Sequence, residues 1–69
     1  MEDVTSSNIL QVGWFGGVMT VRFRSGALYS YKNVSISTYL TVLAAQSIGS
    51  TFNKLIKSNP GAYPFELVE

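Results

Sequence analysis

The residues of this chain that could do chemistry are its basic side chains, because it has no histidine and no cysteine. Without them it lacks the usual general base, the commonest metal ligand and a thiolate nucleophile. The bases are Arg22, Arg24, Lys32, Lys54 and Lys57. The four acids lie near the termini, at Glu2, Asp3, Glu66 and Glu69. We therefore expect no catalytic residues, no metal site and no cofactor.

The charge distribution points to anionic partners. Residues 4–65 carry five bases and no acid, so the body of the chain has a net charge of +5. A small basic body attracts phosphates and other anions. The alternative is that this charge only keeps a small domain in solution.

A β-hairpin over residues 18–32 is predicted to position three of these bases. Met19, Val21 and Phe23 alternate with polar residues, which is typical of a half-buried strand. Arg24 to Gly26 reads as a three-residue loop with Gly26 in the left-handed conformation. Phe23 then faces Ala27, Val21 faces Tyr29 and Met19 faces Tyr31. A two-residue loop would instead place the tyrosines beside the arginines, and we prefer the register that buries them.

An earlier strand is predicted to run from Ser7 to Trp14, after a flexible lead over residues 1–6. Gly16-Gly17 supplies the two positive φ angles of a primed hairpin turn. Counting back from that turn, Trp14 faces Met19, Val12 faces Val21 and Leu10 faces Phe23. Two loops thus predict the same buried face of a three-stranded antiparallel meander.

Two short helices follow. Ser35 is the expected N-cap of a first helix, which ends near Ala45-Gln46. Ser47 is the expected N-cap of a second helix, which ends at Asn59-Pro60. Gly49 in the first turn of the second helix indicates a close approach to another backbone or to a ligand. The prediction is one α+β domain over residues 7–65, with both helices on one face of a three-stranded sheet, and a tail over 66–69. No stretch is long and apolar enough to span a membrane, and we expect the cytoplasm.

The sheet face without helices is the first candidate site. It is expected to carry Ile9, Gln11, Thr20, Arg22, Leu28, Ser30 and Lys32, with Phe15 and Val18 at its rim. A flat face with arginines and nearby aromatic rings can hold phosphates and stack bases. Alternatively, Ile9, Phe15, Val18 and Leu28 form an apolar patch that pairs with a second copy.

The second candidate site is the start of the last helix. Backbone N–H groups at a helix start attract phosphate or carboxylate, and Ser47, Ser50 and Lys54 could assist. The stretch is not a P-loop, because it lacks the Gly-Lys-Ser/Thr ending and a preceding strand. The alternative is an ordinary capped helix. Asn53 makes either a structural bond to the sheet or to the loop at Asn33, which we favour, or a ligand contact.

Several motifs together resemble the KTSC domain family. They are Ser6-Ser7-Asn8-Ile9, then Phe23 with Ser25-Gly26, Leu28-Tyr29 and Tyr31, then Val34 and Tyr39, and finally Ser47 with Gly49 and Phe52-Asn53. That family is a small module at the C-terminus of some lysyl-tRNA synthetases and a free-standing protein in bacteria and phages. The resemblance covers about residues 6–63 and implies a binding module. This chain differs in its shorter first hairpin, in Ser35 where the family usually has proline, and in its acidic tail.

The sequence therefore predicts a non-catalytic module that captures a phosphate-bearing ligand, either RNA or a small nucleotide held between protomers of a homo-oligomer. A phage protein of this kind could sequester a nucleotide signal of host defence in the host cytoplasm. The predicted ligand-binding residues are Arg22, Arg24, Lys32, Ser47, Gly49, Ser50, Asn53 and Lys54. The alternative is a protein–protein or oligomerisation module that uses Ile9, Phe15, Val18 and Leu28.

Overall fold

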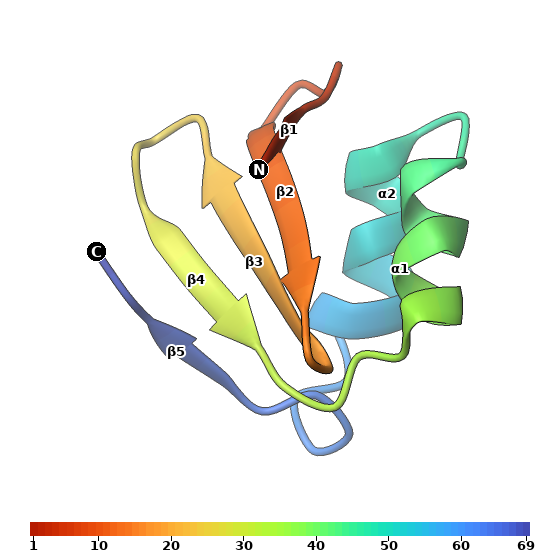
Figure 1. Ribbon diagram of the computed structural model, residues 1–69. Coiled ribbons are helices and arrows are strands. Elements are labelled where there is room, and N and C mark those ends of the chain that lie inside the picture. Colours follow the sequence, from red (N-terminus) through yellow and green to blue (C-terminus); the bar gives the residue numbers. More distant parts are fainter.

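One antiparallel sheet, with its strands in chain order, forms a layer that carries the helices on one face (Figure 1). The computed structural model describes residues 1–69. The strands are β1 Glu2–Asp3, β2 Ile9–Phe15, β3 Val18–Phe23, β4 Leu28–Tyr31 and β5 Phe65–Leu67. The helices are α1 Ile36–Leu43, α2 Ile48–Phe52 and the π-helix η1 Asn53–Lys57. The α+β class is confirmed, but the prediction of three strands was wrong, because the sheet has five.

The two strands that the sequence did not predict are short and lie at the sheet edges. β1 pairs with β2, and the Gln11 side-chain amide donates a 2.8 Å hydrogen bond to the Asp3 carboxylate. β5 pairs with β4, so that Phe65 lies opposite Tyr31 and Leu67 opposite Tyr29. Strands of two and three residues are too short to show a period-2 pattern. The segments expected as a lead and a tail thus extend the sheet at both edges.

Both predicted hairpin registers are confirmed over most of their length. In the first, Trp14 lies opposite Met19 and Val12 opposite Val21, and Gly16 and Gly17 have φ angles of 56° and 86°. The second places Val21 opposite Tyr29 and Met19 opposite Tyr31. Its loop is closed by a 2.9 Å bond from the Phe23 N–H to the Ala27 carbonyl, and Gly26 has a φ of 98°. Glycine, which has no Cβ, adopts such angles readily.

A β-bulge at the start of β2 overturns one prediction. Ile9 rather than Leu10 lies opposite Phe23, and the pairing then shifts by one residue, so that Gln11 lies opposite Arg22. A bulge inserts one unpaired residue and therefore exchanges the faces of the residues before it. Ile9 is fully buried, whereas Leu10 is 40% exposed. Ile9 was predicted on the open sheet face and instead belongs to the core.

The helices are held mainly by packing. The Ser35 hydroxyl accepts a 3.1 Å bond from the Thr38 N–H, so the predicted N-cap of α1 is confirmed. α1 ends at Leu43, slightly earlier than predicted. Ser47 precedes α2 but makes no side-chain cap bond. The buried core joins sheet and helices and consists of Ile9, Val12, Met19, Val21, Tyr31, Val34, Tyr39, Val42, Phe52 and Ile56.

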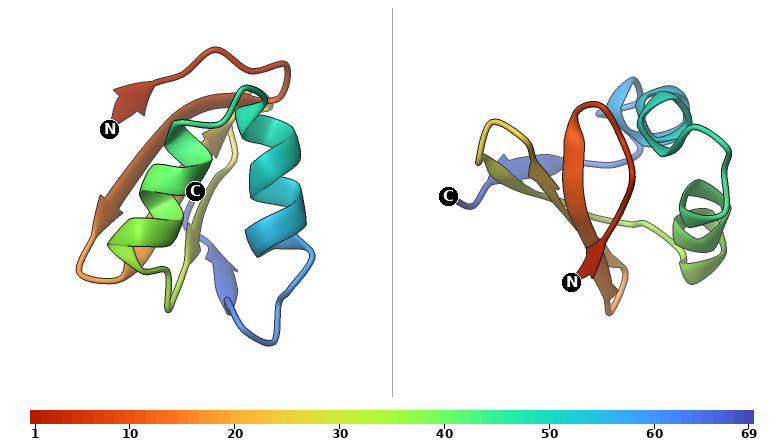
Figure 2. Two further views of the ribbon diagram at one scale, coloured as in Figure 1. Left: turned by 90° about the vertical axis from the view of Figure 1, so that its right-hand side faces the viewer. Right: turned by 90° about the horizontal axis from the view of Figure 1, so that it is seen from above.

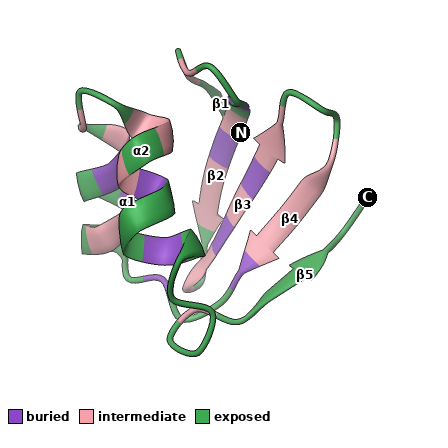
Figure 3. Cartoon of the chain, turned by 180° about the vertical axis from the view of Figure 1, so that it is seen from behind, coloured by how far each residue is buried: buried purple, intermediate pink, exposed green.

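The helices cover only part of the sheet. They lie on the side of β2 and β3, and β5 lies at the edge farthest from them (Figures 1 and 2). Burial differs in the same way, since every residue of β5 is exposed while β2 and β3 contribute four buried residues, Ile9, Val12, Met19 and Val21 (Figure 3). The helix-side face of β5 is therefore left open, whereas on β4 Tyr31 is buried and Tyr29 only partly so. None of the helices has the length and apolar character needed to cross a membrane.

Candidate functional site

The open part of the helix-side face forms a groove of about 660 Å³ between β4–β5 and the end of η1. Its walls include four aromatic rings, and we call it the aromatic groove. The rings belong to Phe23, Tyr29, Tyr31 and Phe65, and the other lining residues used below are Ser7, Asn8, Arg24 and Lys57. The groove lies on the opposite face of the sheet from the site that the sequence placed first.

The rings form one continuous aromatic surface because of the strand register. Tyr29 and Tyr31 are two residues apart on β4, so they project from the same face, with ring centroids 6.4 Å apart and planes 30° apart. Phe65 lies 5.9 Å from Tyr31 and 6.0 Å from Tyr29. Phe23 meets Tyr29 edge-on at 5.7 Å and 82°. Phe65 is 54% exposed, so the outer end of this surface is open to a planar ligand.

The tyrosine at the base of the groove is a neutral polar group. Burial raises the pKa of Tyr31 above its ordinary value, and the nearby Tyr29 raises it further. A tyrosine hydroxyl is protonated at neutral pH and can donate or accept a hydrogen bond.

Two cations flank the groove. The Lys57 ammonium nitrogen lies 5.5 Å from the centroid of the Phe23 ring. Arg24 donates a 2.9 Å bond from Nε to the Ser6 carbonyl, which fixes the side chain and leaves its two terminal nitrogens for another partner. No carboxylate lines the groove. Aromatic faces and uncompensated positive charge thus meet in one place.

A second depression, which we call the polar hollow, adjoins the start of α2. It has a volume of about 390 Å³, and its lining includes Ser6, Ser7, Asn8, Ser47, Gly49, Ser50 and Asn53. A Cβ atom at Gly49 would lie 2.7 Å from Asn8 Oδ1 and 3.0 Å from Ser6 Oγ. Gly49 is thus closely approached, but by side chains of the 6–8 segment and not, as the sequence predicted, by another backbone.

Four predicted ligand-binding residues lie together here, namely Ser47, Gly49, Ser50 and Asn53. The structural bond that we favoured for Asn53 was wrong, because its exposed side chain makes no hydrogen bond to the sheet or to Asn33.

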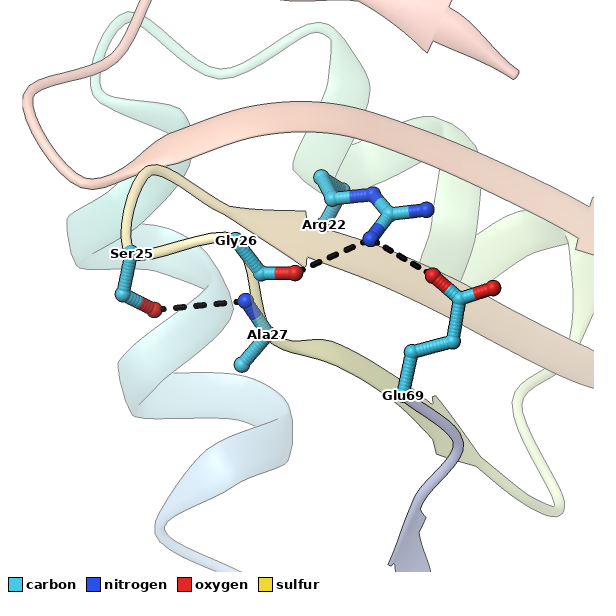
Figure 4. A network of polar contacts seen from close by, with 5 residues as sticks. All are labelled: Arg22, Ser25, Gly26, Ala27 and Glu69. Atoms are coloured by element: carbon cyan, nitrogen blue, oxygen red, sulfur yellow. Dashed lines mark hydrogen bonds and ion pairs between the residues drawn. The ribbon is translucent and has the colours of Figure 1, made fainter.

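The predicted basic residues do not converge. Arg22 lies on the open sheet face, where its Nη1 is 2.9 Å from both the Glu69 carboxylate and the Gly26 carbonyl (Figure 4). Lys32 and Lys54 are exposed and line neither the aromatic groove nor the polar hollow. Only Arg24 among the predicted bases reaches the groove.

Sequence reasoning missed Lys57 and the rings of Tyr29, Tyr31 and Phe65 as site residues. The period-2 pattern of Tyr29 and Tyr31 correctly gave their shared face, and its assignment to the core holds for Tyr31, which is buried, and in part for Tyr29. The signal that was missed is that two short helices cannot cover a sheet widened by β5. The position of Phe65 depends on that strand, which no pattern in the sequence predicts.

Three of the four predicted interface residues lie on the open sheet face. Phe15 is 87% exposed at the tip of the first hairpin, and Val18 and Leu28 are half-buried. Ile9 is buried in the core and cannot contact a partner from this face. The structure also brings no group of three acids together in a metal-binding arrangement.

Comparison with known proteins identifies the family to which this fold belongs. A family model for the KTSC domain matches residues 5–59. The crystal structure of the KTSC domain protein YPO2434 from Yersinia pestis superposes with a TM-score of 0.87 at 26% sequence identity, over 99% of this chain and 94% of that one. No curated protein matches this chain. Since the family model covers most of the residues and the structural match covers the whole fold, the chain belongs to the KTSC domain family.

Proposed function

We propose that this chain is a non-catalytic binding module that captures a phosphate-bearing ligand, a nucleotide or RNA, in the aromatic groove. The observation that carries the proposal is the meeting of four aromatic rings with Arg24 and Lys57 in a groove that no acid lines. The absence of histidine and cysteine supports a binding role over a catalytic one.

The groove supplies both contacts that a nucleotide needs. A base that stacks on an aromatic side chain gains about 1–3 kcal/mol. The exposed ring of Phe65, beside Tyr29 and Tyr31, offers such a surface. Arg24 and Lys57, which also line the groove, would supply charge-assisted hydrogen bonds to a phosphate, and the planar guanidinium suits two of its oxygens.

Charge reversal tests this proposal. The variant Arg24→Glu with Lys57→Glu removes both groove cations, and Lys32→Glu with Lys54→Glu makes the same change of net charge at two exposed positions outside the groove. Fluorescence anisotropy with a labelled short oligoribonucleotide should show lost binding for the first pair and mostly retained binding for the second. Equal losses would show that net charge alone accounts for the interaction. Retained binding by the Arg24→Glu and Lys57→Glu double variant would refute the proposal.

Salt provides an independent check. Phosphate contacts release counterions, so the logarithm of the affinity should fall linearly with the logarithm of the salt concentration. Two phosphate-contacting cations predict a shallow slope of about −1.4 for a single strand. An affinity that does not change with salt would contradict a phosphate contact.

One form of the proposal is sequestration of a nucleotide signal of host defence between protomers of a phage or bacterial protein. Its support is the exposed apolar edge beside the groove, where Phe65 is 54% and Leu67 60% exposed. A second copy that covers this edge would close the ligand in. Native mass spectrometry of protein from its natural cytoplasm should then show an oligomer with the extra mass of a nucleotide. A bare monomer would contradict this form.

A second candidate function is a protein–protein module on the open sheet face. It is favoured by Phe15, which is 87% exposed at a hairpin tip where it contributes little to the core. Val18 and Leu28 extend the apolar surface. Phe15→Ser should then lower the mass measured by light scattering, without any dependence on salt. An unchanged monomer mass before and after substitution would exclude self-association through this tip.

A further inference from the structure

The aromatic groove and the polar hollow are neighbours with a shared wall. Ser7 and Asn8 line both depressions. Arg24 lines the groove, and its Nε binds the carbonyl of Ser6, which lines the hollow. The guanidinium of Arg24 is therefore anchored at the junction, and its terminal nitrogens make no bond within the chain.

The polar hollow offers free hydrogen-bonding groups and no charge. The side chains of Ser47, Ser50 and Asn53 make no hydrogen bond within the chain. The lining contains neither an aromatic residue nor an acid. Hydroxyl and amide groups of this kind pair with sugar hydroxyls and base edges. The hollow is thus unsuited to stacking and suited to the polar parts of a nucleotide.

One element contributes to both depressions. η1 begins at Asn53, which lines the hollow, and ends at Lys57, which lines the groove. Along this path the aromatic groove, which Lys57 also lines, is followed by Arg24 at the junction and then by uncharged polar groups. That order matches a base, a phosphate and a neighbouring sugar.

We infer that the ligand is a chain of at least two linked nucleotides that spans both depressions, an inference that rests on the proposed function. One base stacks in the aromatic groove. The phosphate that joins the two nucleotides contacts Arg24 at the junction. The sugar and base edge of the second nucleotide bind Ser50 and Asn53. A free dinucleotide and a single-stranded RNA share this chemistry.

Calorimetric titration with three probes tests the inference. They are adenosine monophosphate, the 5′-phosphorylated linear diadenylate and a hexa-adenylate. The dinucleotide should bind at least about tenfold more tightly than the mononucleotide, because it adds a phosphate contact and two or more hydrogen bonds. A hexamer that binds like the dinucleotide indicates a dinucleotide ligand, and one that binds more tightly indicates an RNA strand. Either result supports a site for linked nucleotides.

The matched variant is Ser50→Ala with Asn53→Ala, both exposed positions where alanine favours the helix. It should remove most of the dinucleotide advantage and leave mononucleotide affinity unchanged. Ser37→Ala, an exposed serine on α1, is the control and should change neither.

The failures are distinguishable. If mononucleotide and dinucleotide bind equally, the two-nucleotide site is refuted while the proposed function stands. If the double variant weakens both probes by the same factor, the hollow does not contact a second nucleotide, and the inference is again refuted. If no probe binds the wild-type chain, the proposed function fails along with the inference.

Discussion

Lys57 and Phe23 form a cation–π contact across the aromatic groove, with the ammonium nitrogen 5.5 Å from the ring centroid. Phe23 comes from the end of β3 and Lys57 from the end of η1, so this contact joins the sheet to the last helical turn. An exposed contact of this kind is worth only about 0.5–1 kcal/mol. Its larger consequence is that a positive charge is held beside the aromatic surface.

Replacing Lys57 should therefore affect binding more than stability. For Lys57→Gln we expect an unfolding free energy within about 1 kcal/mol of wild type and a nucleotide affinity lower by about tenfold. Lys54→Gln, on the same helix but outside the groove, is the matched control and should change neither by much. Urea unfolding and calorimetry measure the two quantities. Equal affinity losses in both variants would show that Lys57 has no specific contact with the ligand.

The C-terminal strand supplies the outermost ring of the groove. Phe65→Ala removes a stacking surface and should lower nucleotide affinity by about tenfold or more. Val68→Ala is the control, because Val68 follows β5, still pairs with Leu28 of β4, has a similar exposure and does not line the groove. Binding that weakens equally in both variants would indicate that β5 acts only as a structural strand.

Gly49 lies close to the 6–8 segment, and a double-mutant cycle can measure the coupling free energy between Gly49 and Asn8. An added Cβ would crowd Asn8 Oδ1 at 2.7 Å, whereas alanine in a helix gains up to about 1 kcal/mol over glycine. Gly49→Ala should therefore be more favourable on an Asn8→Ala background than on wild type, by about 1 kcal/mol. Thermal unfolding of the four proteins in this cycle checks the prediction. Additive effects would mean that Asn8 moves aside without cost.

Stability should fall at high pH. Burial raises the pKa of Tyr31, and burial raises the pKa of Tyr39, with a smaller contribution from Glu2, whose carboxylate accepts a 3.4 Å bond from the Tyr39 hydroxyl. A tyrosine whose pKa is higher in the folded than in the unfolded protein contributes full stability below the unfolded pKa of about 10. That stability is lost as the pH rises through the folded pKa, because the unfolded chain then ionises more readily.

Urea unfolding between about pH 8 and about pH 11 tests this dependence. The double variant Tyr31→Phe with Tyr39→Phe should lose less stability over that range than wild type. An identical pH dependence in the two proteins would show that other groups are responsible.

The parts of the fold that follow from local patterns could be predicted from the sequence. Gly16-Gly17 and Gly26 fixed two hairpin registers, because positive φ angles and loop length leave few alternatives. The bulge at Leu10 could not be predicted, since Ile9 and Leu10 are both apolar and either can face the core. Nor could β5, because its three exposed residues are positioned by pairing with β4 rather than by their own pattern.

The candidate site could be predicted only in part for the same reason. Ser47, Gly49, Ser50 and Asn53 are near one another in sequence, and the structure also places them together. Arg22 and Arg24 are two residues apart, so a continuous strand would place both side chains on one face. In the structure Arg22 pairs with Glu69 on the open sheet face, whereas Arg24 donates a hydrogen bond to Ser6 at the groove. That division depends on Ser6 and Glu69, which lie near opposite ends of the chain and are distant from the two arginines in sequence.

The central claim is that a nucleotide binds in the aromatic groove rather than on the open sheet face. The most direct test is a nuclear magnetic resonance titration of the labelled protein with the 5′-phosphorylated diadenylate. We predict that the largest chemical-shift changes fall on Phe23, Tyr29, Tyr31, Lys57 and Phe65. Changes centred on Phe15, Val18 and Leu28, or no changes at millimolar ligand, would contradict the account.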